Sequence, residues 1–201
     1  MAESKKSGPP TIKGAALLGF LKYIKGKPNG EELLKKVIDA MPPELAPSCR
    51  QRVVAVAEYP YALFVAFIRA ADKTLGRGDL SICKELGKAT ALRDIESVGQ
   101  LFQREPRIED LYRSGDVYWK SYHLNSGSWK VEDTNPEQTV MRIYDFPEMD
   151  PAHCRLMEGW MTQAMISCGV LMSGEVREVK CMSQGDPYHE FIARWRAKAG
   201  K

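Results

Sequence analysis

The hydrophobic pattern of this chain changes its period near residue 125, and this change constrains the fold more than any other feature. Before it, apolar residues recur at three- and four-residue spacing, which is typical of helices that bury one face. After it, residues 128–133 and 139–146 alternate between apolar and polar side chains, as strands do. The order predicts an α+β fold, with an N-terminal helical half packed on a small antiparallel sheet.

The helices expected in the first half are separated by turn residues. The most apolar one spans residues 59–76, with Pro60 near its start and Gly76 at its end. Because this segment is apolar nearly all round, we expect it to be the central buried helix. Further helices are expected at residues 14–24, 30–41, 79–102 and 106–124.

One more helix is expected between the strands of the second half. It spans residues 149–169, with Asp150 as the capping residue and Pro151 at the first helical position. The chain then returns to strand patterns at residues 175–181 and 188–195, which predict a final hairpin.

The composition bounds the domain organisation. A chain of 201 residues, 44% of them hydrophobic, is long enough for one sizeable core. No linker rich in Gly, Ser and Pro occurs between residues 11 and 195, so we expect a single domain there. Residues 1–10 are polar and contain two prolines, which predicts a disordered tail.

Charge and cysteine content narrow the function classes. The net charge of +3 comes without long runs of one sign, so nucleic acid is not an expected partner. No apolar window of about 18 residues and no signal-peptide pattern occur, so we expect no membrane span. The five cysteines lack the spacing of a disulfide scaffold, which predicts a cytoplasmic protein with free or metal-bound thiols. Cys49 and Cys83 are expected to fill the core.

The final hairpin and the helix before it carry side chains that hold metals. If the hairpin is symmetric about its tip, Cys181 lies opposite His189, close enough to share a zinc ion. Glu178 is three residues from Cys181 and joins them only if a bulge or strand end near Val179 turns its carboxylate round. Cys154 is a further donor, since a helix N-terminus is expected to lower the pKa of a thiol in the first turn.

A simpler interpretation of the same residues stays open. Buried small thiols and a surface histidine would give the same spacing without a metal, and His153 is expected to point elsewhere on the helix. Cys154 also belongs to a stripe of sulfur-containing residues at helical spacing, which is more typical of a core. That stripe consists of Cys154, Met157, Met161, Met165 and Cys168.

The C-terminal third resembles the vinyl-4-reductase-type small-molecule-binding domain. That pattern is a Cys, a Gly five positions on, Glu-x-x-Cys-x-x-x-Gly and a final Cys. It stands here at Cys154, Gly159, Glu178, Cys181 and Gly185, with His189 in place of the last Cys. In sensor members the corresponding side chains bind zinc beside a ligand pocket. The resemblance therefore implies a zinc site at Cys154, Glu178, Cys181 and His189, since imidazole replaces thiolate in many zinc sites.

Over its whole length the chain is similar to a family of uncharacterised myxobacterial proteins, which implies a bacterial source. Residues 12–41 resemble the heme nitric-oxide-binding domain, whose superfamily also contains the dimeric TRAPP tethering subunits. The residues themselves argue against heme. Aligning the family's Tyr-x-Ser-x-Arg propionate clamp on Tyr144 puts Phe146 and Glu148 at the other two positions, and no histidine lies between residues 90 and 122. His123 stands at the end of a predicted helix, where axial ligation requires a shifted geometry.

The resemblance implies a non-catalytic sensor that binds a small apolar or aromatic ligand. Side chains that could line its pocket are Trp119, Tyr122, Trp160, Met161 and Met165, although each could equally be core packing. The alternative is a protein-interaction scaffold without a ligand, acting as a homodimer or with a regulatory protein partner. An enzyme is not expected, because the sequence shows no catalytic triad order, phosphate-binding glycine loop or close carboxylate pair.

Overall fold

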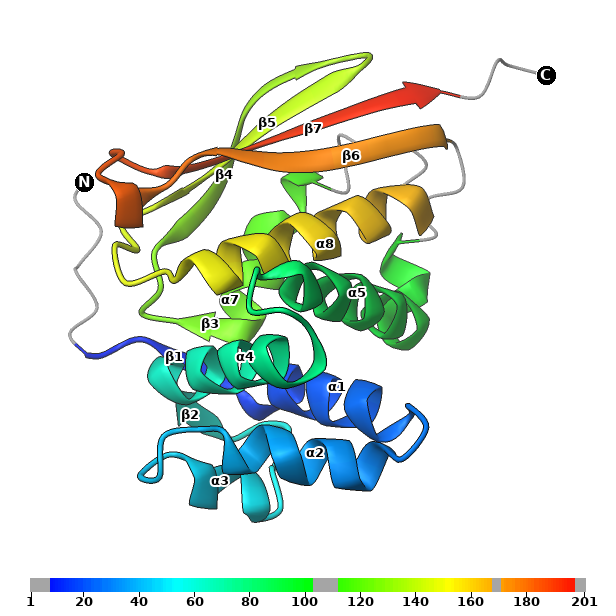
Figure 1. Ribbon diagram of the computed structural model, residues 1–201. Coiled ribbons are helices and arrows are strands. Elements are labelled where there is room, and N and C mark those ends of the chain that lie inside the picture. Colours follow the sequence, from blue (N-terminus) through cyan, green and yellow to red (C-terminus); the bar gives the residue numbers. More distant parts are fainter. Residues whose placement is uncertain (1–7, 103–111, 168–170, 198–201) are drawn as a thin grey trace.

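The computed structural model describes residues 8–102, 112–167 and 171–197. It is an α+β structure, as expected, in which a helical half lies beneath an antiparallel sheet (Figure 1). The helices are α1 (Gly14–Lys25), α2 (Gly30–Asp39), α3 (Ala46–Arg50), α4 (Tyr61–Leu75), α5 (Ser81–Phe102), α7 (Gly115–Tyr122) and α8 (Pro151–Ser167). The strands are β1 (Thr11–Lys13), β2 (Glu58–Pro60), β3 (His123–Leu124), β4 (Ser128–Asn135), β5 (Gln138–Tyr144), β6 (Leu171–Lys180) and β7 (His189–Ala197).

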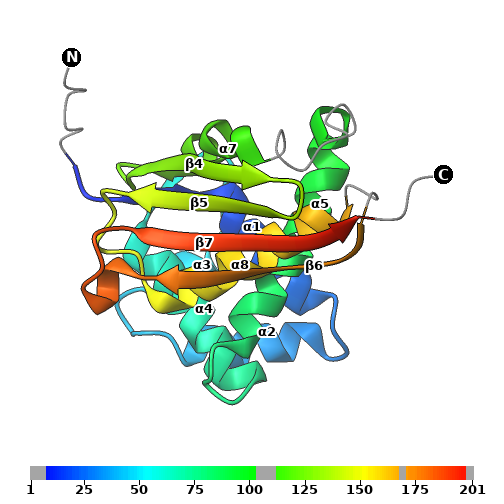
Figure 2. The same cartoon turned by 90° about the horizontal axis from the view of Figure 1, so that it is seen from above.

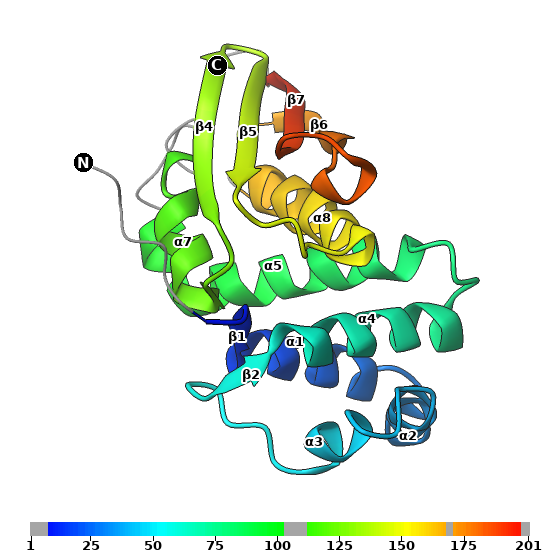
Figure 3. The same ribbon diagram turned by 90° about the vertical axis from the view of Figure 1, so that its left-hand side faces the viewer.

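The four long strands form one antiparallel sheet in the order β4-β5-β7-β6. Its lower face rests on α8, and none of the described helices lies on its upper face (Figure 2). Along β5 the residues alternate between buried and half-buried, as expected for a strand with one face on the core. Below α8 lie α5 and then α4 with α1, so the molecule is built in layers (Figure 3). Because α8 lies between the sheet and α5, it is buried over most of its length.

Two glycines let α5 and α8 approach each other closely. A Cβ atom added to Gly159 of α8 would lie 1.9 Å from the backbone oxygen of Lys84 in α5. A Cβ atom added to Gly87 of α5 would lie 2.0 Å from the backbone oxygen of Leu156 in α8. Only a residue without a side chain fits at these two points, so the pair fixes how the helical half meets the layer above it.

A second, three-stranded sheet has the order β2-β1-β3 and was not foreseen. Its strands are two or three residues long, too short to show an alternating pattern. In β1, Ile12 is fully buried and pairs with His123 of β3. This small sheet therefore places His123 over the helical half.

The expected helix at residues 106–124 differs from the structure. Helix α7 begins at Gly115 and ends at Tyr122, after which the chain becomes extended as β3. Residues 106–111 and the first seven residues of the expected tail lie outside the described part of the chain. Within the described part, the tail is attached to the body, because the Pro10 carbonyl accepts a hydrogen bond from the Tyr61 amide, 3.1 Å away.

Candidate metal cluster and internal cavity

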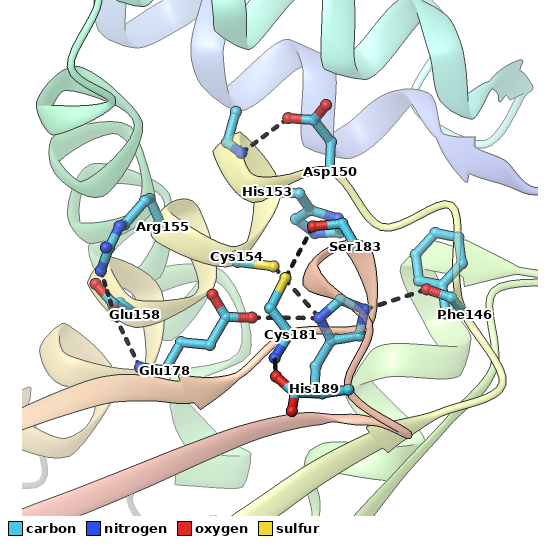
Figure 4. A network of polar contacts seen from close by, with 12 residues as sticks. Phe146, Asp150, His153, Cys154, Arg155, Glu158, Glu178, Cys181, Ser183 and His189 are labelled. Carbon is cyan, nitrogen blue, oxygen red and sulfur yellow. Dashed lines mark hydrogen bonds and ion pairs between the residues drawn. The ribbon is translucent and has the colours of Figure 1, made fainter.

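Four side chains from three segments meet at one end of the sheet. Cys154 comes from the first turn of α8, Glu178 from β6, Cys181 from the turn after β6, and His189 from the start of β7. Their potential ligand atoms all lie within 4.8 Å of one another (Figure 4). We call these four residues the thiol–imidazole cluster. His189 is fully buried, so its interpretation as a surface histidine is wrong.

A bulge turns the Glu178 carboxylate toward the cluster. Glu178 pairs with Phe191 and Lys180 pairs with Glu190, so the register shifts by one residue between them. The irregularity expected near Val179 is therefore present, and it places Glu178 on the same side as Cys181. Strand pairing stops at Lys180 rather than continuing to Cys181, whose amide donates a 2.8 Å hydrogen bond to Asp186 in the turn.

The pKa values of the two thiols of the cluster are shifted in opposite directions. A hydrogen bond from the Cys154 thiol lowers the pKa of Cys181 to about 6, and the Ser183 hydroxyl 3.0 Å away also favours the thiolate. The same pairing, together with burial and the Glu178 carboxylate, raises the pKa of Cys154. The expectation that the helix N-terminus lowers the pKa of Cys154 is therefore wrong. The pairing therefore favours the thiolate form of Cys181 over that of Cys154.

The imidazole of the cluster is oriented by the backbone. His189 Nε2 lies 3.2 Å from the Phe146 carbonyl, which can only accept, so Nε2 carries a hydrogen and the ring directs Nδ1 into the cluster. Nδ1 lies 3.5 Å from Cys154 Sγ and 3.2 Å from the Glu178 carboxylate. A histidine whose second nitrogen donates to a carbonyl is the usual arrangement of a metal ligand.

A buried carboxylate next to the cluster holds the bulged strand. Glu158 of α8 is 1% exposed and accepts the Glu178 backbone amide at 2.8 Å. It also pairs with Arg155 at 2.7 Å and with Lys84 at 3.6 Å. Two sulfurs, an imidazole nitrogen and a carboxylate oxygen, each with supporting contacts, form a donor set suited to tetrahedral zinc.

A cavity of about 70 Å³, partly open to solvent, lies between α7, α8 and the helical half. Its walls are mainly aromatic and include Phe20, Phe64, Trp119, Tyr122, Trp129 and Trp160. Three of the expected pocket residues, Trp119, Tyr122 and Trp160, therefore line it. Met161 and Met165 do not: both are fully buried in the core, and Met165 packs against Gly174 of β6. At one end, Trp160 Nε1 donates to the Asp94 carboxylate at 3.1 Å, and Arg93 pairs with that carboxylate at 2.7 Å.

Two histidines, His123 and His153, line the cavity, and neither was predicted as a pocket residue. The His123 ring stacks on Trp119 with centroids 3.8 Å apart, and its centroid lies 5.1 Å from that of His153. The Nε2 atom of each ring is buried without a hydrogen-bond partner, although His123 as a whole is partly exposed. Burial lowers the pKa of His123 to about 3 and also lowers that of His153.

One signal in the sequence could have found His153. It shares an i, i+4, i+7 stripe with Met157 and Trp160, and both of these also line the cavity. The next residue, Cys154, faces the thiol–imidazole cluster, so the first turn of α8 belongs to both sites (Figure 4). No such signal exists for His123, because the small sheet that positions it has no pattern of its own.

No helix among the described residues is long and apolar enough to span a membrane. The cysteines that the structure describes outside the cluster, Cys49 and Cys83, are free and buried, as expected for core residues.

No protein-family model and no curated protein sequence match the chain. Solved structures do. An Fe(II) unliganded H-NOX protein from K. algicida superimposes on this chain with a TM-score of 0.72 and 14% identity; the match covers 94% of this chain and 100% of that protein. For an H-NOX protein from S. oneidensis in the Fe(II)NO state, the match covers 92% of this chain and 99% of that protein, with 12% identity and a TM-score of 0.69. A structure described as probing heme distortion in the H-NOX family has 10% identity and a TM-score of 0.69.

These neighbours correct our expectation about the cofactor, which was zinc and not heme. Proteins with the same fold are described with Fe(II) and heme, so the argument against heme is contradicted. That argument relied on sequence position, whereas the small sheet carries His123 into the cavity. There His123 Nδ1 lies 3.2 Å from the Trp119 carbonyl, which leaves Nε2 free, as in an axial ligand. Phe146 packs on Tyr61 and Trp119, so propionates would need partners other than the expected clamp. The chain has the H-NOX fold.

Proposed function

We propose that this chain is a non-catalytic sensor domain that holds a small ligand in the cavity between α7 and α8. One observation carries the proposal: an aromatic cavity contains two buried imidazoles whose Nε2 atoms have no partner. A buried polar atom without a partner costs about 1–3 kcal/mol, and a ligand that pairs with it removes that cost. Ligand binding would thereby stabilise one arrangement of the layers, which is how a sensor domain reports occupancy.

The size and walls of the cavity set the class of ligand. One water needs roughly 10–15 Å³ of such space, so about 70 Å³ holds several waters or one small molecule of about a single ring. The walls are aromatic side chains, which favour an apolar or aromatic body. A small apolar molecule is therefore the first candidate ligand.

Heme is the second candidate, and the position of His123 favours it. Its Nε2 would bind the iron, while the Trp119 carbonyl accepts the Nδ1 hydrogen and fixes the ring. When bound, heme would supply an iron site for a diatomic gas. A porphyrin is larger than the present cavity, so the walls would have to move apart to admit it.

One set of measurements tests both candidates. Protein expressed with a heme precursor is examined for a Soret band, with His123→Ala as the variant expected to lose it and His189→Ala as the control expected to keep it. Protein without heme is screened by thermal shift against one-ring aromatic and lipid-like compounds, because a ligand of the folded state raises the melting temperature. If the protein shows no Soret band and none of the compounds shifts its melting temperature, the sensor proposal is refuted. A homodimer in native mass spectrometry would then favour the scaffold function.

We propose further that the thiol–imidazole cluster holds a structural zinc ion. The ion would link the start of α8 to the final hairpin, and its binding energy would contribute to folding stability. Protein purified without chelator and without a metal-affinity tag should contain about one zinc per chain. Cys181→Ser should lose it, whereas Cys83→Ser, a buried thiol outside the cluster, should retain it. Equal zinc content in the two variants would contradict the proposal.

A further inference from the structure

We propose that His123 and His153 form a donor–acceptor pair that recognises a hydroxyl group on a neutral, apolar ligand. This inference rests on the sensor proposal, because it assumes that the cavity takes a small molecule. It adds the polar chemistry that the ligand must have. The argument depends on which ring nitrogen of each histidine carries the hydrogen, and the hydrogen-bond partners decide that.

His153 presents a donor. The Tyr61 hydroxyl accepts a hydrogen bond from the Asp150 backbone amide at 3.1 Å. The hydrogen of that hydroxyl therefore points to its other neighbour, His153 Nδ1, 3.0 Å away. A neutral imidazole that accepts at Nδ1 carries its hydrogen on Nε2. His153 is fully buried, so this Nε2–H group has no water to bind.

His123 presents an acceptor. Its Nδ1 lies 3.2 Å from the backbone oxygen of Trp119, which can only accept, so Nδ1 carries the hydrogen. The lone pair is then on Nε2, and this atom is also buried without a partner. The two rings thus offer one donor and one acceptor to the same cavity.

A hydroxyl group matches this pair in chemistry, and the two rings lie close together. The two ring centroids lie 5.1 Å apart with an interplanar angle of 20°. A hydroxyl oxygen held by both nitrogens, with hydrogen bonds of about 2.8 Å, would accept from His153 and donate to His123. The remainder of the ligand would lie against the aromatic walls.

Charged ligands fit less well. A carboxylate could use only the His153 donor, and an ammonium group only the His123 acceptor, and each would lose its hydration in the cavity. The carboxylate that lines the cavity, Asp94, already binds Arg93 and Trp160. A hydrocarbon would leave both Nε2 atoms unpaired. The pair therefore selects an alcohol over a hydrocarbon of the same shape.

Benzyl alcohol and ethylbenzene provide the test, because they differ by a hydroxyl in place of a methyl group. Binding to protein without heme is measured by thermal shift and by ligand-observed NMR. We expect benzyl alcohol to bind about tenfold more tightly or better, since a site built for a hydroxyl rejects the analogue that lacks it. His123→Phe and His153→Phe keep an aromatic ring, and each should reduce or reverse this ratio while ethylbenzene binding remains.

The outcomes separate this inference from the function on which it rests. Ethylbenzene binding as tight as or tighter than benzyl alcohol in the wild type refutes the hydroxyl pair but leaves the sensor proposal intact. If neither compound binds, and no other tested ligand binds either, both proposals are refuted. The NMR chemical shifts of the imidazole nitrogens report the tautomers in the unsubstituted protein, so this check needs no variant. They should place the hydrogen on Nε2 of His153 and on Nδ1 of His123. Any other tautomer pair overturns the inference.

Discussion

Each histidine of this chain gets its chemistry from the partner of one ring nitrogen. The chain contains three histidines, and the structure places all three in or beside a site. A carbonyl holds His189 at Nε2 and leaves Nδ1 for the thiol–imidazole cluster. A carbonyl holds His123 at Nδ1 and leaves Nε2 for the cavity. Residue type alone therefore could not have assigned these roles.

Stability should fall in mild acid because of His123. Its pKa is lowered to about 3 by burial, whereas an unfolded histidine titrates near 6.5. Below about pH 6.5 the unfolded state binds a proton that the folded state rejects, so stability is lost as the pH falls toward 3. Between about pH 7 and pH 5, this histidine should account for a loss of roughly 2 kcal/mol.

Urea unfolding at the two pH values measures this loss. His123→Phe cannot bind a proton, so its stability should depend less on pH than that of the wild type by about the same 2 kcal/mol. An unchanged pH dependence in this variant would show that the ring is protonated in the folded state.

Glu158 should contribute more to stability than exposed acidic residues do. Glu158→Leu leaves the Glu178 amide without its acceptor and the Arg155 guanidinium without its partner. Losing the hydrogen bond to this buried carboxylate, together with an ion pair whose guanidinium is half exposed, should cost about 1–3 kcal/mol in the free energy of unfolding. The control is Glu85→Leu, which removes an exposed pair with Lys88 and should change stability by less than about 0.5 kcal/mol. Equal effects on chemical denaturation would contradict the assigned role.

The residues of the cluster were predictable, but their protonation was not. The spacing raised Cys154, Glu178, Cys181 and His189 as candidates, and the resemblance to the vinyl-4-reductase-type domain implied them as one set. The odd spacing of Glu178 required a bulge near Val179, which is present. The acidity of the two thiols depends on which one donates to the other and on burial, and neither is visible in a sequence.

At the scale of elements, the contact between α5 and α8 depends on two glycines, Gly87 and Gly159. Gly159→Ala adds a methyl group 1.9 Å from the Lys84 carbonyl, and neither backbone can move alone. Alanine is the better helix former by about 1 kcal/mol. Overpacking of a tight contact costs about 1–3 kcal/mol or more, and this overlap with backbone is severe. We therefore expect a net loss of about 2 kcal/mol.

Thermal and chemical denaturation measure this loss, with Gly26→Ala as the matched control. Gly26 caps α1 with φ −73°, and an added Cβ would meet other atoms only at 3.4 Å or beyond. This substitution should be neutral or slightly stabilising. If Gly159→Ala also proves neutral, α5 and α8 are not held at the distance seen here.

Long elements were predictable from the sequence because many residues share one period. The expected helices at residues 14–24 and 59–76 match α1 and α4, and the two expected hairpins match β4 with β5 and β6 with β7. The strands β1, β2 and β3 were not predictable, because their hydrogen bonds join residues far apart in the chain. The position of His123 in the cavity was not predicted for the same reason.

At the scale of the whole molecule, we expect one cooperative unfolding transition. The cavity walls come from both halves, and α8 packs on both the sheet and α5. The four tryptophans all lie after residue 118, so their fluorescence reports on the second half, whereas circular dichroism of helices is dominated by the first. The two signals should give the same midpoint in urea. Two separate midpoints would show that the halves unfold independently.

The strand order of the large sheet has a consequence for the timing of folding during synthesis. Among the described strands, β6 pairs only with β7, and β7 lies between β5 and β6 although it is made after both. Until β7 emerges from the ribosome, β5 and β6 cannot join, and the newly made β6 has an unpaired edge. The same step delivers His189, so the thiol–imidazole cluster can be completed only after the helical half has been synthesised. A chaperone that binds exposed strand edges would therefore act on this protein late, after its helices are already available to fold.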